Sequence, residues 1–190
     1  MARPGAPSAP SGARRAAVFA VIWIATLAAD QLSKAWAHTL PVAPSGGVQP
    51  GELLAGRCQG VPQPVVDGYW DWELAYNPGV AFSTFASAAG HAGMRLVLAA
   101  VAVIALLGIG LVALRSTADE RGRRAAYALI AGGALGNLVD RVRDGAVTDF
   151  VRWRIHEHRW PIFNLADAAL LVGVALLLLE GLRARRTAAR

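Results

Sequence analysis

The chain has 190 residues, of which 55% are hydrophobic, with a mean hydropathy of +0.39 and a formal net charge of +6. The positive charge does not indicate nucleic-acid binding, because the arginines flank long apolar runs and form no basic stripe among aromatic residues. Cys58 is the single cysteine, which excludes an intramolecular disulfide and a multi-cysteine zinc site.

Long uncharged runs predict a membrane protein with four transmembrane helices. The runs cover 16–29, 96–114, 125–139 and 168–179. The first, third and fourth reach the roughly 20 residues that span a bilayer only if Asp30, Asp140 and Asp167 lie within or at the rim of the span. The predicted helices cover 16–37, 93–114, 123–141 and 161–182. Placing an ionised acid at that depth of the bilayer costs roughly 2.5 kcal/mol or more of free energy, so such acids usually face a partner, water or a substrate.

Arginine placement predicts the orientation of these helices. Arginines precede the first helix, join the second to the third and follow the fourth, and the positive-inside rule places these ends in the cytoplasm. They are Arg3, Arg14, Arg15, Arg115, Arg121, Arg123, Arg124, Arg183, Arg185, Arg186 and Arg190. One outer loop is also basic, and we attribute its arginines to binding acidic residues or lipid headgroups. They are Arg141, Arg143, Arg152, Arg154 and Arg159.

The long outer segment divides into two parts. Residues 41–68 are rich in Pro and Gly and are expected to form a flexible insertion. Aromatic residues then alternate with acids between Tyr69 and Tyr76, which predicts a strand at the membrane interface. Asn77-Pro78-Gly79 is a turn signal, and 80–85 is expected to resume a short strand. A small sheet on the outer leaflet is the simplest arrangement.

Asp30 and Lys34 are four residues apart near the outer end of the first helix, with the acid first, which is the favourable order for an ion pair. We expect an interfacial salt bridge with Lys34 extending outward to the headgroups. Contact of Asp30 with a substrate is the second interpretation.

The third helix carries the segment GGALGNLVDR. Its Gly132 and Gly136 form a GxxxG pair, which is typical of helix packing in membranes. Asn137, Asp140 and Arg141 share one face with Gly136. Asp140 and Arg141 are expected to neutralise each other where the helix reaches the outer interface, with direct catalysis by Asp140 as the alternative.

Two further acids predict proton chemistry: Asp149 in VTDF and Asp167 in FNLAD. Asn164 is three residues before Asp167, where it is expected to cap the last helix and hold Asp167 in position. Two carboxylates in a poorly hydrated site would share a proton, because adjacent like charges cannot both ionise cheaply. The ionised member would activate water and the protonated member would donate to the oxyanion or leaving nitrogen.

Other chemistries are less well supported. The four histidines show no metal-ligand spacing. A four-helix transporter or proton relay would place acids along a path through both leaflets, whereas Asp30, Asp140, Asp149 and Asp167 all map to the outer half. A metal-dependent membrane transferase with Asp144 and Asp149 as ligands lacks a further acid or histidine at ligand spacing.

Together these motifs resemble the lipoprotein signal peptidase (signal peptidase II) family, which are bacterial intramembrane aspartyl proteases. The resemblance runs from about 16 to 182 and rests on five motifs in the family's order. They are DQLSK at 30–34, YNPGVAFS at 76–83, GGALGNLVDR at 132–141, VTDF at 147–150 and FNLADA at 163–168.

The resemblance implies cleavage of signal peptides from prolipoproteins, immediately before a cysteine that carries a diacylglyceryl group. Its catalytic pair falls on Asp149 and Asp167. The residues expected to bind substrate or support the site are Asp30, Lys34, Asn77, Gly79, Asn137, Asp140, Arg141 and Asn164. No metal or other cofactor is implied. The expected partners are diacylglyceryl-modified prolipoproteins, membrane lipids and globomycin-like inhibitors, with no nucleic acid and a monomeric protein.

The implied fold class is an α-helical membrane protein with four transmembrane helices and a small extracytoplasmic β-sheet cradle. The expected organisation is a cytoplasmic tail (1–15), a peptidase domain (16–182) and a second cytoplasmic tail (183–190), with the insertion at 41–68 and the cradle at about 69–85. The expected location is the bacterial cytoplasmic (inner) membrane, multi-pass, with both termini cytoplasmic and the active site near the outer face.

Overall fold

The structure is a computed structural model. It describes residues 12–42, 60–77, 97, 100, 103–104, 108–111, 121–155 and 157–188. The elements in chain order are α1 (Gly12–Ala37), β1 (Gln63–Val66), β2 (Trp70–Asn77), α4 (Arg121–Arg143), β3 (Val147–Ile155), β4 (His158–Arg159) and α5 (Leu165–Ala188).

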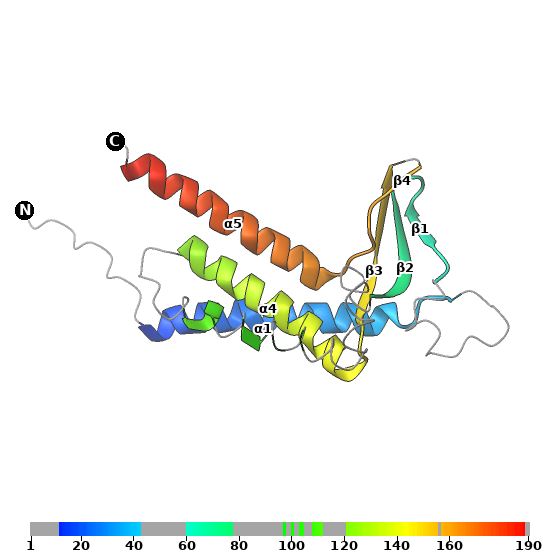
Figure 1. Ribbon diagram of the computed structural model, residues 1–190, viewed down its shortest axis with the longest axis horizontal. Helices are drawn as coiled ribbons and strands as arrows, with labels where there is room; N and C mark the ends of the chain where they lie inside the picture. The colour runs from blue at the N-terminus through cyan, green and yellow to red at the C-terminus, as the bar shows by residue number, and fades with distance from the viewer. Residues whose placement is uncertain are drawn as a thin grey trace, which may run out of the picture.

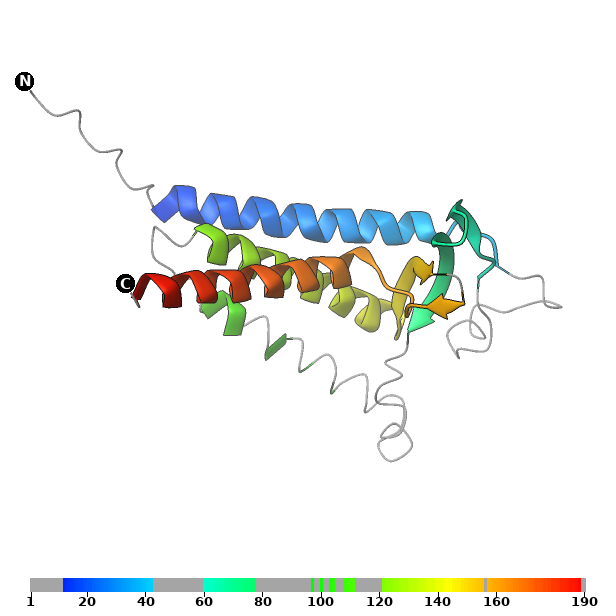
Figure 2. The same ribbon diagram turned by 90° about the horizontal axis from the view of Figure 1, so that it is seen from above.

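In the described part of the chain, the long helices α1, α4 and α5 lie side by side, with the sheet at one end of the bundle (Figure 1). The middle helix, α4, contacts both α1 and α5. α1 and α4 run toward the sheet and α5 runs away from it, so the C-terminal ends of two helices meet the N-terminal end of the third beside the strands (Figure 2).

The outer helices α1 and α5 expose apolar side chains. Val21 and Ile24 on α1, and Leu171 and Leu178 on α5, are all more than half exposed. Both helices are long and apolar enough to cross a membrane, over Gly12–Ala37 and Leu165–Thr187. Apolar residues that face outward along a spanning-length helix are what a hydrocarbon solvent requires, because lipid and not protein covers them.

Close packing of α4 depends on its glycines. A Cβ on Gly132 would lie 2.7 Å from Thr26 Cβ on α1, and a Cβ on Gly133 would lie 2.5 Å from the Ala166 carbonyl oxygen on α5. A Cβ on Gly136 would collide with the Asp30 carboxylate. The GxxxG pair is therefore confirmed as a packing motif, because small residues let two backbones approach.

The helix boundaries differ modestly from the prediction. α1 begins at Gly12 and not at 16, and α5 covers Leu165–Ala188 and not 161–182. Alanines before the first apolar run are good helix formers, and arginines in the last turn of α5 complement its dipole. Most of the predicted helix 93–114 lies outside the described residues, although 108–111 are helical. The four-span arrangement therefore stays a prediction.

The sheet is antiparallel, with strand order β1-β2-β3-β4. The predicted aromatic strand is confirmed as β2, and the VTDF segment begins β3, which pairs with it so that Ala75 lies opposite Asp149. β1 falls within the predicted insertion 41–68 and carries Pro64, which an edge strand tolerates because one side of its backbone is free. The predicted strand at 80–85 lies outside the described residues.

Aromatic contacts pack the sheet against the bundle, and charged contacts join two of its strands. Trp36 at the end of α1 makes edge-on contacts with Trp72 and Phe150, with ring centroids 5.1 and 5.9 Å apart. On the other side of the strands, Arg152 lies 2.6 Å from Glu73. Arg154 likewise pairs with Asp71 at 2.9 Å. Two arginines of the basic outer loop therefore bind acidic residues, as the sequence predicts.

The turn between α4 and β3 returns the chain to the bundle. α4 ends at Arg143, and Gly145 follows with a φ of 76°, the left-handed conformation that favours glycine after a helix. The Gly145 amide donates to the Arg141 carbonyl at 3.1 Å. This tight reversal places the first residues of β3 directly beside the last turn of α4.

Candidate active site

Asp149 lies on β3 and is 2% exposed. Its Oδ1 accepts a hydrogen bond from Asn164 Nδ2 at 2.7 Å. Burial, and then the negative charge of Asp167, raise its pKa from 3.8 to about 7, although hydrogen bonds from Asn77 and Asn164 act in the opposite direction. Near neutral pH this carboxyl can therefore hold or release a proton.

Asp167 lies in the first turn of α5. Asn164, the residue before the helix, accepts the Asp167 amide hydrogen at its Oδ1 (2.9 Å), and Asp167 Oδ2 accepts the Asn164 amide hydrogen (3.3 Å). This reciprocal pair satisfies two backbone donors at a helix start and holds the aspartate side chain close to the helix axis. The predicted capping role of Asn164 is confirmed.

Two asparagines connect the two acids. Asn164 contacts Asp149 through its side chain and Asp167 through its backbone. Asn137 on α4 donates from Nδ2 to Asp167 Oδ1 at 2.8 Å, and its Oδ1 accepts from Asn164 Nδ2 at 3.1 Å. Asp149, Asn164, Asn137 and Asp167 thus form one hydrogen-bonded cluster, although they come from a strand, a helix cap and two helices.

Beside this cluster, Lys34 joins two further acids. Its ammonium group lies 2.8 Å from Asp30 and 2.9 Å from Asp140, and it donates to Asn137 Oδ1 at 3.0 Å. Lys34 is only 1% exposed. The predicted ion pair with Asp30 is confirmed, but the outward extension of Lys34 is wrong. Three acceptors match the three ammonium donors, so the buried position replaces the hydrogen bonds of water.

The two acids of this second cluster also hold backbone groups. Asp30 Oδ1 accepts the Ala166 amide hydrogen at 2.9 Å, which ties α1 to the first turn of α5. Asp140 Oδ2 accepts the Thr148 amide hydrogen at 3.0 Å, which ties α4 to β3. Asp140 was expected to be neutralised by Arg141, and the structure pairs it with Lys34, because Lys34 is buried on the facing helix.

Arg141 lies in the last turn of α4, next to both clusters. Its guanidinium lies near the carboxyl groups of Asp167, Asp149 and Asp140. Its Nη1 donates to the Asn137 carbonyl oxygen at 3.3 Å, whereas its buried Nε has no hydrogen-bond partner among the described residues. Of the remaining predicted site residues, Asn77 ends β2 beside Asp149, and Gly79 lies outside the described residues.

Three polar residues that the sequence did not single out join the site. Gln31 donates from Nε2 to Asp140 Oδ1 at 3.1 Å, and His38 Nε2 lies 3.1 Å from Thr148 Oγ1. Gln31 and Thr148 are neighbours of predicted acids, and His38 follows Lys34 by four residues and so shares its helix face. That spacing is the signal that identifies His38. Among the described residues, no group of three His, Cys, Asp or Glu side chains could hold a metal ion.

The fold is that of a helical membrane protein. Two solved structures of a bacterial membrane enzyme, obtained by the in meso method, superpose with TM-scores of 0.66 and 0.67. Their sequences are 23% and 22% identical to this chain. The superpositions include 88% and 86% of this chain, and 88% and 92% of the two solved chains.

Sequence comparisons with known proteins assign the family of this chain. Residues 22–183 match the model for signal peptidase (SPase) II. Lipoprotein signal peptidase of Xanthomonas campestris pv. campestris is 35% identical over 88% of this chain and 94% of its own. The corresponding proteins of Xanthomonas axonopodis pv. citri and Xylella fastidiosa are 38% and 37% identical, over 86% and 81% of this chain and 87% and 84% of theirs. The chain therefore belongs to the lipoprotein signal peptidase family, whose members are peptidases.

Proposed function

We propose that this protein is an aspartyl endopeptidase that removes signal peptides from prolipoproteins, cleaving before the diacylglyceryl-modified cysteine. Asp149 and Asp167 are the catalytic pair. The observation that carries the proposal is the shared contact of both carboxyl groups with Asn164, in a site where one carboxyl has a pKa of about 7. Two adjacent acids that divide one proton can act as base and acid in a single step.

The surroundings of the two acids assign their roles. Asp149 is more deeply buried than Asp167 and its pKa is raised, so it holds the shared proton. Asp167 accepts N–H groups from Asn137 and Asn164 at the positive end of a helix, surroundings that suit an ionised carboxylate. Asp167 is then the general base and Asp149 the general acid for the first step. The titration belongs to the pair and not to either residue alone.

Attack begins with a water molecule between the acids and the scissile peptide. Asp167 takes a proton from this water as its oxygen bonds to the carbonyl carbon, and Asp149 gives its proton to the carbonyl oxygen. The product is a neutral tetrahedral diol, with Asp149 now ionised and Asp167 protonated. No negative charge accumulates on the substrate, which suits a poorly hydrated site.

Collapse of the diol reverses the roles. Asp149 recovers a proton from one hydroxyl as the carbonyl re-forms, Asp167 gives its proton to the nitrogen, and the carbon–nitrogen bond breaks. The products are the carboxyl end of the signal peptide and the free amine of the lipid-modified cysteine. Both acids return to their starting states, and the proposed cycle calls on no metal or other cofactor.

Residues around the dyad position the substrate in this proposal. The Arg141 guanidinium has a free Nε among the described residues and lies beside both acids, so it can donate to a substrate carbonyl. Asn77 and the neighbouring Gly79 would hold the substrate backbone near Asp149. Asp30, Lys34, Asn137, Asp140 and Asn164 fix the geometry and do not react.

The arrangement supports a location in the bacterial inner membrane. Arg121 and Arg123 begin α4 and Arg185 and Arg186 end α5, all at the end of the bundle far from the sheet (Figure 1). The positive-inside rule then places both termini in the cytoplasm and the acids near the outer face. A second span at 93–114 completes four crossings. A globomycin-like peptide would inhibit by occupying the dyad, and the enzyme would work as a monomer.

The test is cleavage of a diacylglyceryl-modified prolipoprotein by purified protein in detergent. Wild type should cleave it in the presence of chelator, and Asp149→Asn and Asp167→Asn should each abolish cleavage while remaining folded. Asp144→Asn is the matched control, because Asp144 lies just after α4 but pairs with the exposed Arg143. Full activity in either dyad variant would remove that residue from the mechanism, and an inactive wild type would overturn the proposed function.

A further inference from the structure

Thr148, the residue directly before Asp149, is held by side chains from three separate parts of the chain. It is 0% exposed. Its backbone amide donates to Asp140 Oδ2 at 3.0 Å, and its carbonyl oxygen accepts from Asn164 Nδ2 at 3.2 Å. Its hydroxyl oxygen, Oγ1, lies 3.1 Å from His38 Nε2. The helix α4, the residue before α5 and the residue after α1 therefore each hold one polar group of Thr148.

His38 continues the last turn of α1. Its backbone amide donates to the Lys34 carbonyl oxygen at 3.1 Å, as in a further helical residue. Residues four apart share one face of a helix, so Lys34 and His38 both approach the start of β3. Lys34 acts on Thr148 through Asp140, whose carboxylate holds the backbone amide. His38 acts on Thr148 directly, at the hydroxyl.

The end of α1 contacts β3 on either side of Asp149. The Trp36 ring lies edge-on to Phe150, with centroids 5.9 Å apart. His38 contacts Thr148, two residues earlier on the strand. Successive side chains of a strand face opposite sides, so Thr148 and Phe150 share the side that meets α1. The end of α1 therefore fixes the backbone around Asp149 from the side that the Asp149 carboxyl group does not face.

The neighbouring strand supports the imidazole ring. Tyr76 on β2 is the cross-strand partner of Thr148, and its ring centroid lies 5.9 Å from that of His38. His38 is exposed, whereas the hydroxyl that it contacts belongs to a fully buried residue. A buried hydroxyl that loses its hydrogen-bond partner costs free energy, so Thr148 would shift to find another. Such a shift moves the adjoining Asp149.

We propose that His38 is a positioning residue for the peptidase reaction, and that its contact with Thr148 holds the Asp149 carboxyl group where proton transfer to the substrate requires it. His38 itself neither reacts nor binds substrate. The inference rests on the proposed function, because it assigns His38 a role in a reaction that Asp149 performs. Reacting groups tolerate little displacement, since a misplacement of about 1 Å can cost about 10²-fold in rate.

The test measures kcat and KM separately for cleavage of the diacylglyceryl-modified prolipoprotein by the full chain in detergent. His38→Ala should lower kcat by about tenfold, less than the limit above because two backbone contacts of Thr148 remain. KM should not change. His38→Gln should recover most of the loss, because an amide of similar reach can donate or accept. His38→Asn carries the same amide on a shorter side chain and should lose kcat as His38→Ala does.

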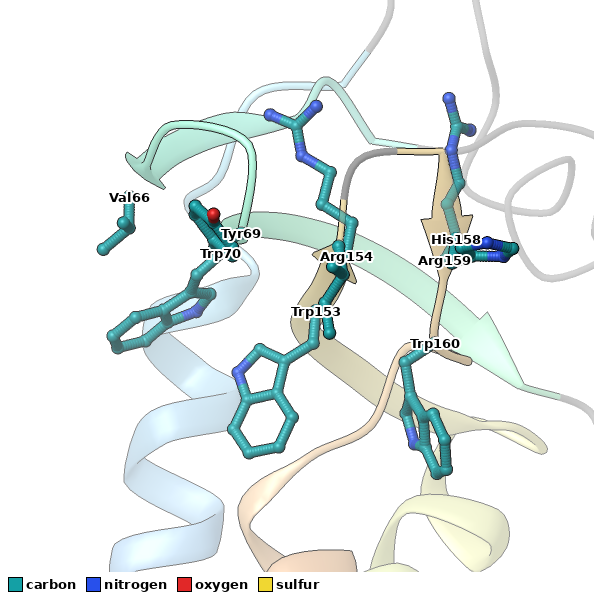
Figure 3. A pocket seen from close by; sticks show the side chains of 9 residues that line it. Val66, Tyr69, Trp70, Trp153, Arg154, His158, Arg159 and Trp160 are labelled. Carbon is teal, nitrogen blue, oxygen red and sulfur yellow. The ribbon is translucent and has the colours of Figure 1, made fainter.

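His158→Ala is the matched control. His158 is also an exposed histidine of the sheet, but it pairs with Ile155 at the end of β3 far from Asp149. There it lines a pocket with several tryptophans (Figure 3). Its removal should leave kcat and KM unchanged, so a loss in His38→Ala alone would not come from removing any histidine of the sheet.

A double substitution tests whether His38 acts through Thr148. Thr148→Val removes the hydroxyl and keeps the branched shape, and should lower kcat as much as His38→Ala. The variant that combines both changes should be no slower than the slower single variant, because each change removes the same contact. Thr148→Ser retains the hydroxyl and should retain kcat. Thermal unfolding in detergent checks that each variant is folded.

Four results would overturn the proposal. Losses that multiply in the double variant would show that His38 acts independently of Thr148. A raised KM with unchanged kcat in His38→Ala would make His38 a substrate contact. Wild-type kcat in both His38→Ala and His38→Asn would remove His38 from the reaction and leave the proposed function intact. A wild-type protein that does not cleave the prolipoprotein would instead remove the proposed function, and the positioning role with it.

Discussion

Two clusters of carboxylates lie side by side at the end of the bundle next to the sheet, and a lysine links the two acids in only one of them. Asp30 and Asp140 both contact the Lys34 ammonium within 3 Å. Asp149 and Asp167 are instead joined through the neutral amides of Asn164 and Asn137. Asp30, Asp140 and Asp149 are each at most 2% exposed, so these acids differ chiefly in their partners.

The partners decide whether a proton can move. The Lys34 ammonium pairs with both acids of the first cluster, and their carboxylates also accept the backbone amide hydrogens of Ala166 and Thr148. Amides donate hydrogen bonds to a carboxylate but supply no charge. Burial, and then the negative charge of Asp167, raise the pKa of the Asp149 carboxyl to about 7, and the hydrogen bonds from amides offset only part of this rise. The first cluster builds the site, and the second can react.

The largest expected effect is on activity, from neutral substitutions in the amide-linked cluster. Asp149→Asn and Asp167→Asn should each lower kcat by roughly 10²–10⁴-fold, because each removes a proton donor or acceptor from the chemical step. Thermal unfolding in detergent should change little, since asparagine preserves the shape. Retention of more than a tenth of the activity in both variants would contradict the assigned roles.

The next largest effect is on stability, from the cation of the other cluster. Lys34→Met leaves Asp30 and Asp140 as buried unpaired charges, and should lower the free energy of unfolding by roughly 3–5 kcal/mol. Unfolding in detergent, followed by circular dichroism, measures the loss. Adding Asp140→Asn to Lys34→Met should recover part of it, because one unpaired charge is gone. A Lys34→Met protein as stable as wild type would show that the cluster is not held by charge.

The sequence identifies the residues of both clusters, but it predicts only the contacts between residues that are close in the chain. Asn164 and Asp167 interact within one helix turn, so their spacing alone predicts the cap. The partner of Asp140 depends on how α1 packs against α4, and no local pattern contains that information. Lys34 was therefore expected at the headgroups, although it lies inside the bundle at 1% exposure.

The same holds for the fold: the sequence predicts single helices and strands better than it predicts which strands pair. The apolar runs predict α1 and α5, and alternation predicts β2, because helix and strand periods are local. β1 was not expected, since a Pro- and Gly-rich composition conceals a short edge strand whose stability comes from pairing with β2. The pairing of VTDF with the aromatic strand likewise depends on the turn at Gly145 and on the docking of α4.

A smaller effect is expected where α1 approaches α4. Gly136→Ala places a methyl group against the Asp30 carboxylate, and should lower the free energy of unfolding by about 1–3 kcal/mol through overpacking. Gly181→Ala is the matched control, because a Cβ there meets nothing within 4 Å in a helix. The control should be neutral or stabilising by up to about 1 kcal/mol. Equal unfolding temperatures for the two variants would show that the helices separate readily and would weaken the view of the lysine cluster as a rigid support.

The effect that separates the clusters most directly is pH dependence. Asp149 has a folded pKa of about 7, above its ordinary 3.8, so it is protonated in the folded protein at pH 5 to 6. As pH rises through about 7 the general acid is lost, and kcat/KM should fall by roughly tenfold per pH unit above that point. The folded state also binds more protons than the unfolded state between pH 3.8 and about 7, so stability should decline over that window and level off above it.

Asp149→Asn should abolish this stability decline, because it removes the titrating group. Lys34→Met should be less stable at every pH but should still lose stability as pH rises toward 7, because Asp149 and its amide partners remain. The pH dependence of unfolding for the three proteins distinguishes the two clusters. An unchanged decline in Asp149→Asn would assign the titration to another group, and the proton would then not belong to the amide-linked pair.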